Sequence, residues 1–110
     1  MGKWATYRKR GGSTGSTVAL TSPPVPSLYI EGGLIKQSAR VGDDTVGQIR
    51  LQQSDDGNDP WYQVDSGAWV ATKTWGTVVQ YFGYWLRCYE IGNGIAYAGN
   101  SPYSAVLPVP

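Results

Sequence analysis

Histidine is absent from this chain, and Cys88 is its only cysteine. Histidine is the commonest general base, so a Ser-His-Asp triad of the usual form is excluded. Zinc loses its main protein ligands for the same reason. A single cysteine excludes an intrachain disulfide, and with it a disulfide-stapled secreted scaffold. We therefore expect a non-enzymatic protein without cofactor or metal, folded in a reducing cytoplasm.

Charged residues are also few, at 15% of the chain against 41% hydrophobic residues, a balance typical of a globular protein with low charge density. No run approaches the roughly 18 apolar residues of a membrane span, and the first residues, MGKWATYRKRGG, lack the apolar core of a signal peptide. A length of 110 residues suits one compact domain. These absences predict a single soluble domain that does not enter a membrane.

Strand-forming and turn-forming residues are abundant, with 5 Trp, 8 Tyr and 15 Gly. From Ser27 onward, short runs of β-formers alternate with Gly, Asp and Asn, and no stretch shows sustained helical periodicity with caps. The pattern predicts an all-β fold, an immunoglobulin-like antiparallel β-sandwich with an extended N-terminal arm. We expect strands near residues 27–35, 45–54, 61–66, 68–75, 77–82, 84–91, 94–99 and 103–109.

Residues 1–27 are predicted to form the arm, and residues 28–110 the sandwich domain. The arm joins a basic aromatic head to a GGSTGST linker and a proline-rich stretch that favours extended backbone. A disordered terminus is one alternative, and contact with nucleic acid is another, although four basic residues are a weak footprint. We expect the head to anchor on a neighbouring protein subunit through Trp4, Tyr7, Arg8, Lys9 and Arg10.

The stretch YWLRCYE, residues 84–90, carries large apolar side chains on both faces of its predicted strand, because alternate residues point to opposite sides. The face that holds Tyr84, Leu86 and Cys88 is predicted to be buried, with Cys88 as a small hydrophobe. Apolar surface on the opposite face is typical of an interaction site. The candidates for a subunit contact are therefore Trp85, Arg87 and Tyr89.

Two further tryptophans, Trp69 and Trp75, lie on one face if residues 68–75 form a single strand, with Trp85 close to them. Flat aromatic faces can stack on sugar rings, so a carbohydrate-binding β-sandwich module is an alternative function. The competing interpretation makes these tryptophans core and interface anchors, and we favour it.

The stretch SDDGNDPW, residues 54–61, combines residues that favour tight turns, and Asp-Gly between two strands indicates a hairpin. Its three carboxylates are also ligands of the type that Ca²⁺ takes, but the glutamate that ends an EF-hand loop is missing. We expect a plain turn, with Trp61 entering the core or capping the end of the sheet.

The stretch YWLRCYEIGNG, followed by AYAGNSPYSAVLPV, resembles the last two strands of immunoglobulin-like and fibronectin type III-like sandwiches. In those folds a tyrosine packs into a corner motif. The resemblance implies this role for Tyr84.

A second resemblance covers GQIRLQQSDDGNDPWYQVDSG followed by YFGYWLRCYE, which is similar to small phage virion proteins with β-sandwich domains. It implies a virion component made in the host cytoplasm, such as a capsid decoration (cement) or tail protein. Such a protein would be a homo-oligomer or would bind other subunits of the capsid or tail. Multiple copies on a lattice also relax the affinity that each contact needs.

Overall fold

The computed structural model of the chain describes residues 22–38 and 46–110. The five predicted anchors of the head, from Trp4 to Arg10, lie outside the described residues. Pro23 and Pro26 are buried, so packing against the sandwich begins before Leu28, inside the stretch assigned to the arm.

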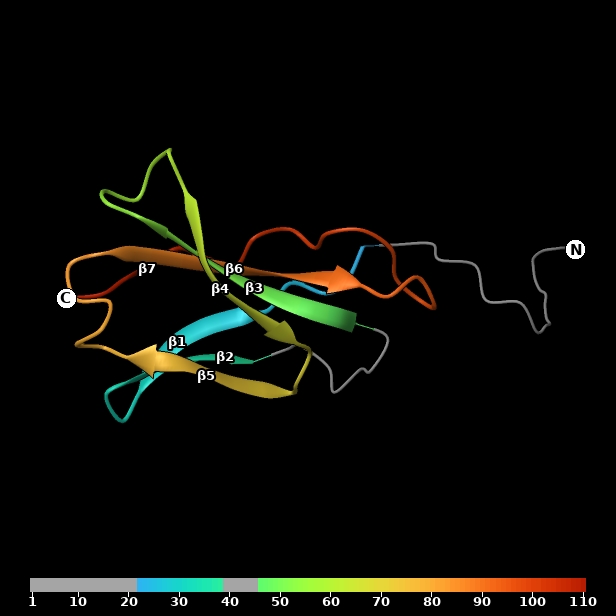
Figure 1. Cartoon of the computed structure of the whole chain (residues 1–110), viewed down its shortest axis with the longest axis horizontal. Helices are drawn as coiled ribbons and strands as arrows, with labels where there is room; N and C mark the ends of the chain where they lie inside the picture. Colours follow the sequence, from blue (N-terminus) through green and yellow to red (C-terminus); the bar gives the residue numbers. More distant parts are fainter. Residues whose placement is uncertain (1–21, 39–45) are drawn as a thin grey trace, which may run out of the picture.

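Seven antiparallel strands form two sheets that pack face to face, one layer below the other in Figure 1. The prediction of an all-β sandwich is confirmed. One sheet has the order β1-β2-β5 and the other β4-β3-β6-β7. No helix occurs in the described part of the chain, which therefore holds no helical membrane span. The strands are β1 Ser27–Glu31, β2 Leu34–Ser38, β3 Val46–Ser54, β4 Tyr62–Ala68, β5 Thr72–Thr77, β6 Trp85–Gly92 and β7 Leu107–Pro108.

The position of the fourth strand distinguishes this sandwich from the constant-type immunoglobulin arrangement. There the fourth strand joins the sheet of the first, second and fifth strands. Here β4 follows β3 through the hairpin at residues 55–60 and stays paired to it, from Gln48 opposite Ala68 to Gln53 opposite Tyr62. The sheets therefore hold three and four strands, with β3 and β6 in the middle of the larger one.

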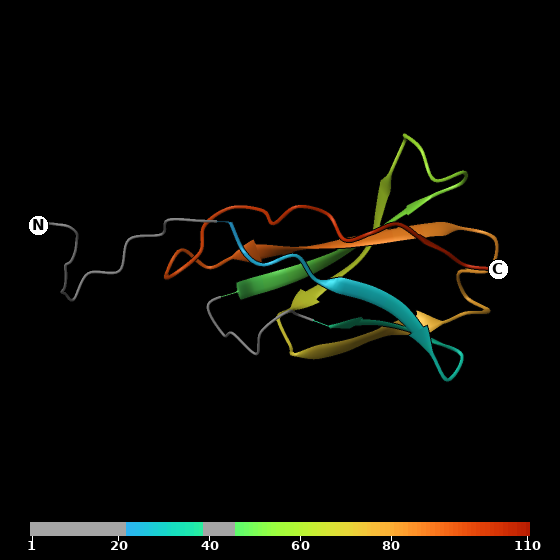
Figure 2. The ribbon, with the colours of Figure 1, turned by 180° about the vertical axis from the view of Figure 1, so that it is seen from behind.

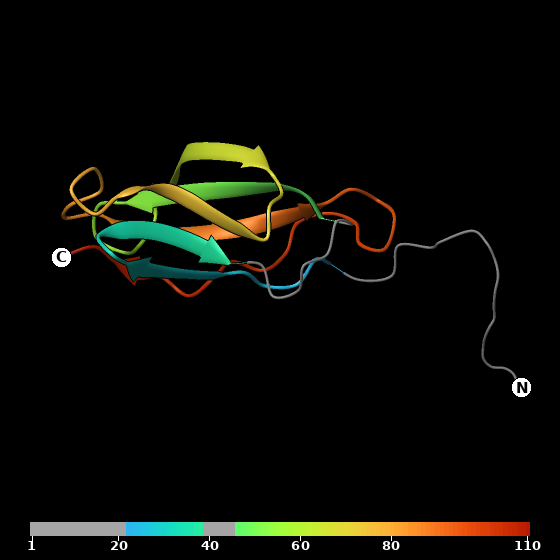
Figure 3. The ribbon, with the colours of Figure 1, turned by 90° about the horizontal axis from the view of Figure 1, so that it is seen from below.

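The predicted strand 27–35 is a hairpin of two strands. Gly32 and Gly33 form a two-residue turn with φ of 61° and 75°, and Glu31 pairs with Leu34 across it. Positive φ at both central residues is the type I′ geometry, whose twist matches that of the flanking strands. Figure 3 shows the two strands side by side and running in opposite directions.

The single strand predicted over residues 68–75 is also wrong, because β4 ends at Ala68 and β5 begins at Thr72. Of the predicted strand 77–82, Thr77 ends β5 and residues 78–82 form consecutive turns, with backbone bonds from Gln80 N to Thr77 O and from Tyr81 N to Val78 O. Residues 94–99 bend without forming a strand, and only Leu107–Pro108 of the predicted strand 103–109 is regular.

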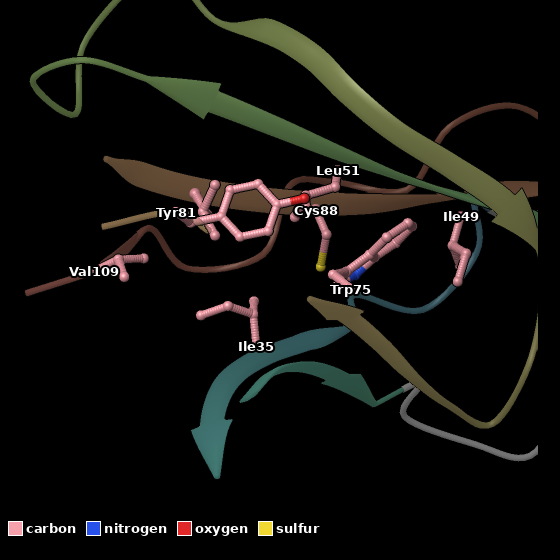
Figure 4. Close-up of a cluster of buried hydrophobic side chains, with 8 residues drawn as sticks. Ile35, Ile49, Leu51, Trp75, Tyr81, Cys88 and Val109 are labelled. Atoms are coloured by element: carbon pink, nitrogen blue, oxygen red, sulfur yellow. The ribbon is translucent and has the colours of Figure 1, made fainter. Parts of the chain in front are cut away.

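The core lies between the sheets (Figure 4) and includes side chains from both. The turn after β5 brings Tyr81 into it, whereas Tyr84 is exposed. The expected burial of Tyr84 is therefore wrong. Tyr84 precedes β6, whereas Leu86 and Cys88 lie within the strand, where alternation points them inward. The cluster comprises Ile35, Ile49, Leu51, Trp75, Tyr81, Leu86, Cys88 and Val109.

Candidate partner-binding face

The outer face of β6 carries Trp85, Arg87 and Tyr89, as the alternation predicted. Leu86 and Cys88 are fully buried on the other side of the same strand. Pairing with β3 places Gln52 opposite Arg87 and Arg50 opposite Tyr89. Polar side chains of β3 thus border the aromatic residues of β6 on the surface that faces away from the three-stranded sheet.

Arg87 is held between two aromatic rings. Its Cζ lies 4.2 Å from the centroid of the Trp61 ring and 3.6 Å from that of Tyr103. Its Nε donates a hydrogen bond of 2.7 Å to Oε1 of Gln52, which fixes the plane of the guanidinium. Tyr103 in turn makes an edge contact with Tyr89, at 5.4 Å between ring centroids. Three segments distant in sequence therefore meet at one cation.

The charge of Arg87 is not neutralised by a carboxylate within the described residues, where the single ion pair joins Lys36 to Glu31 on the other sheet. Nor do its two Nη atoms take part in a hydrogen bond there. A half-buried guanidinium on aromatic faces keeps its planar fork of donors, which matches a carboxylate in a bidentate pair. The geometry suits recognition of an acidic group.

The hairpin between β3 and β4 covers Trp85 and is built as a turn. The Ser54 hydroxyl accepts from the backbone N–H of Gly57 at 3.1 Å and donates to the carbonyl of Asn58, and Oδ1 of Asp56 accepts from Asn58 N at 2.9 Å. Gly57, with φ of 86°, packs directly against the Trp85 ring. No group of three or more metal-ligating side chains occurs within residues 22–38 and 46–110.

The sequence predicted that Trp61 would enter the core or cap the end of the sheet. It does neither. The hairpin returns it across the outer face, where it is half-buried over Arg87. Residues after β6 cover the opposite end of the face. Ser104 and Ser101 accept hydrogen bonds from the backbone N–H groups of Cys88 and Glu90, at 2.9 and 2.8 Å, so this irregular segment follows β6 as an edge strand would.

The aromatic surface is consequently smaller than the sequence indicated. Tyr89 is buried beneath the segment that carries Tyr103, and Trp85 lies beneath the hairpin. Tyr103 is exposed instead, at 49%. We call Trp61, Arg87 and Tyr103 the Arg87 face. Of these three residues the sequence pointed only to Arg87, because the others reach it through turns whose course the pattern does not define.

The tryptophans proposed for sugar binding do not form a common platform. Trp75 is 5% exposed and belongs to the core, with Lys73 Nζ 5.4 Å from its ring centroid. Trp69 packs against the same core, whereas Trp85 lies on the outer face of the other sheet. The single strand on which a shared face for Trp69 and Trp75 depended does not form, and both side chains pack against the core.

Cys88 is a buried free cysteine, as expected. Burial raises the pKa of its thiol to about 12, the Glu90 carboxylate adds to the rise, and the hydrogen bond with Ser104 opposes it. The thiolate is the reactive species, so this thiol is inert in the folded protein.

Comparison of the chain with protein-family models finds no match, and comparison with curated proteins finds no significant relative.

Proposed function

We propose that this chain is a non-enzymatic structural protein of a larger assembly, a phage virion component of the capsid decoration or tail type, and that its Arg87 face binds a neighbouring subunit. The observation that carries the binding role is the aromatic stack around Arg87, whose Nη donors are left for a partner. The virion location is an extension of the sequence resemblance.

The composition of the Arg87 face supports a protein partner. Tyrosine, tryptophan and arginine are the residues most enriched among interface hot spots, because they bury large areas while keeping a polar group for pairing. Trp61 and Tyr103 supply the rings that flank the guanidinium, and the Tyr103 ring is exposed. A carboxylate of the partner would complete the site by accepting from Arg87, as in charge-assisted interface pairs.

Particle association is the direct test. An antibody against the full-length chain, applied to purified phage particles from the source of this sequence, should give regular immunogold labelling. Labelling of no particle would overturn the virion location.

Charge reversal tests the face itself. Arg87→Glu should reduce incorporation of the chain into the labelled particle at least tenfold, because it places a negative charge against the partner's carboxylate. Lys73→Glu is the matched control, since Lys73 also lies over a tryptophan ring but on the other sheet. Equal losses in the two variants, with both folded by circular dichroism, would remove the Arg87 face as the contact.

A further inference from the structure

Two of the sheet edges carry devices that discourage pairing with another chain. Register shifts leave Val64 as an extra residue in β4 and Trp75 as an extra residue in β5. Such bulges bend and twist an edge, and proteins use them to avoid edge-to-edge association. β7 is only two residues long and contains Pro108, which lacks a backbone donor.

β1 lacks these protections. Its register with β2 is unbroken over five residues, SLYIE, which include neither proline nor lysine. It lies at the border of its sheet, nearest the viewer in Figure 2. No backbone hydrogen bond joins its outer side to another segment among residues 22–38 and 46–110.

The turn geometry identifies which backbone groups of β1 point outward. In a two-residue hairpin the closing pair, here Glu31 and Leu34, exchanges both backbone hydrogen bonds. The pairs then alternate, so the N–H and C=O groups of Leu28 and Ile30 point away from β2. Unpaired groups of this kind are a template for strand addition.

We propose that β1 pairs with β1 of a second copy of this chain, antiparallel and about a two-fold axis through Tyr29. In this register Leu28 faces Ile30 of the second copy, and Ile30 faces Leu28, so both outward donors and both outward acceptors of each strand are satisfied. If the axis passes through Leu28 or Ile30 instead, some of these outward N–H and C=O groups have no partner within the strand of the second copy. The result is one continuous sheet through both copies.

The side chains of β1 are self-complementary in that register. Tyr29 lies opposite its own copy in a non-hydrogen-bonded pair, where aromatic side chains make favourable cross-strand contacts. The exposed part of Ile30 becomes covered. Glu31 faces Ser27, not a second carboxylate, and its charge is already paired with Lys36 at 3.0 Å. No like charges oppose each other, as an isologous interface requires.

The contact is small, since one strand edge buries less than the roughly 1,200 Å² of a stable interface. We therefore expect a weak dimer in solution that many copies on a lattice would strengthen. The inference deepens the proposed function by naming a second copy as one partner, and it uses a surface on the opposite sheet from the Arg87 face.

A single introduced cysteine tests the register, because the native Cys88 is buried and inert. The two-fold axis brings the Cα atoms of the two Tyr29 residues to about 4.5 Å, within the range that a disulfide spans. Tyr29→Cys in the full chain should form a disulfide-linked dimer under mild oxidation, seen on a non-reducing gel. Glu31→Cys is the control on the same strand, because its copies lie about 14 Å apart along the strands.

Sedimentation velocity of the full chain over a concentration series gives an independent measurement. We expect reversible dimers, with the dissociation constant raised at least tenfold by Ile30→Lys, which places a lysine at the edge. Val79→Lys, at an apolar site 84% exposed on the turn after β5, should change nothing. Arg87→Glu should also leave dimerisation intact, which separates this inference from the particle-binding role.

Three outcomes would overturn the inference. One is a wild-type chain that stays monomeric at every concentration tested. Another is equal cross-linking by Tyr29→Cys and Glu31→Cys, which would indicate random collision. The last is dimerisation insensitive to Ile30→Lys but abolished by Val79→Lys, which would transfer the contact to the turn.

Discussion

Arg87 connects three parts of the chain that are distant in sequence. Its guanidinium contacts Trp61 after the β3–β4 hairpin, Tyr103 in the C-terminal segment and Gln52 on the neighbouring strand. Because the side chain stacks as well as carries charge, its removal affects packing as much as electrostatics. It thus holds the hairpin and the C-terminal segment to the sheet.

Replacing Arg87 should therefore lower stability as well as binding. Arg87→Ala is expected to reduce the free energy of unfolding by about 1–2 kcal/mol, through loss of the two ring contacts and the bond to Gln52. Urea denaturation followed by tryptophan fluorescence measures this. Lys36→Ala, which removes a cation from a surface ion pair, should cost at most about 1 kcal/mol. A smaller loss for Arg87→Ala than for Lys36→Ala would contradict the stack's structural role.

The Ser104 side chain makes a hydrogen bond to β6 of the kind that the backbone of a regular neighbouring strand would make. Its hydroxyl accepts from the buried backbone N–H of Cys88. Ser104→Ala leaves that donor without a partner, which should cost about 1–3 kcal/mol in chemical denaturation. Ser66→Ala, at an exposed position of β4, should be nearly neutral. Similar stabilities of the two variants would show that the Cys88 donor finds another acceptor.

At the scale of elements, the β3–β4 hairpin is determined by local turn chemistry together with one distant contact. Asp-Gly and the Ser54 network define the turn. The Trp85 ring then restricts which residue fits at position 57, since a Cβ on Gly57 would lie 3.1 Å from two of the ring atoms.

Two glycines with nearly the same backbone angle separate these effects. Gly57 has φ of 86° and packs on Trp85, whereas Gly94 has φ of 89° and open space around it. Both alanine substitutions carry the left-handed backbone cost of about 1–2 kcal/mol. Gly57→Ala should destabilise by about 1 kcal/mol more, through overpacking against the ring. Equal thermal shifts in scanning calorimetry would show that the hairpin moves freely away from Trp85.

Sequence pattern predicted the existence of most strands but not their limits. β3 and β6 were anticipated to within one residue at each end, because both lie in the middle of a sheet and alternate regularly. The run 77–82 has strong β-propensity, and residues 78–82 still form turns, since the chain must cross from one sheet to the other there. The final segment follows β6 through serine side chains, and Pro102 limits regular pairing.

For the whole molecule, burial of ionisable groups predicts a loss of stability in alkali. The pKa of the Cys88 thiol is raised to about 12 in the fold, while in the unfolded chain it stays near its ordinary 8.5. The unfolded state therefore releases this proton first, so the stabilisation is complete below about pH 8.5 and lost as pH rises towards 12. Burial and the nearby Asp65 also raise the pKa of Tyr81, which acts in the same direction.

Unfolding free energies measured between pH 8 and pH 11 should accordingly fall as pH rises. Cys88→Ala should be less stable at pH 8, because it leaves a cavity in the core, but its stability should fall less steeply. Parallel curves for the wild type and Cys88→Ala would show that the thiol does not contribute to the pH dependence.

The sequence by itself determined the all-β class, the inward side of β6, the turn at Asp56–Gly57 and the burial of Cys88, because these depend on local propensity and strand alternation. Tertiary structure decided where Trp61, Tyr81 and Tyr103 point, which tryptophan enters the core, and which strand is left as an unprotected edge. Those properties depend on how turns direct the chain between two sheets, and on contacts between residues far apart in sequence. The alternation of residues along a single strand determines neither the course of the turns nor these long-range contacts.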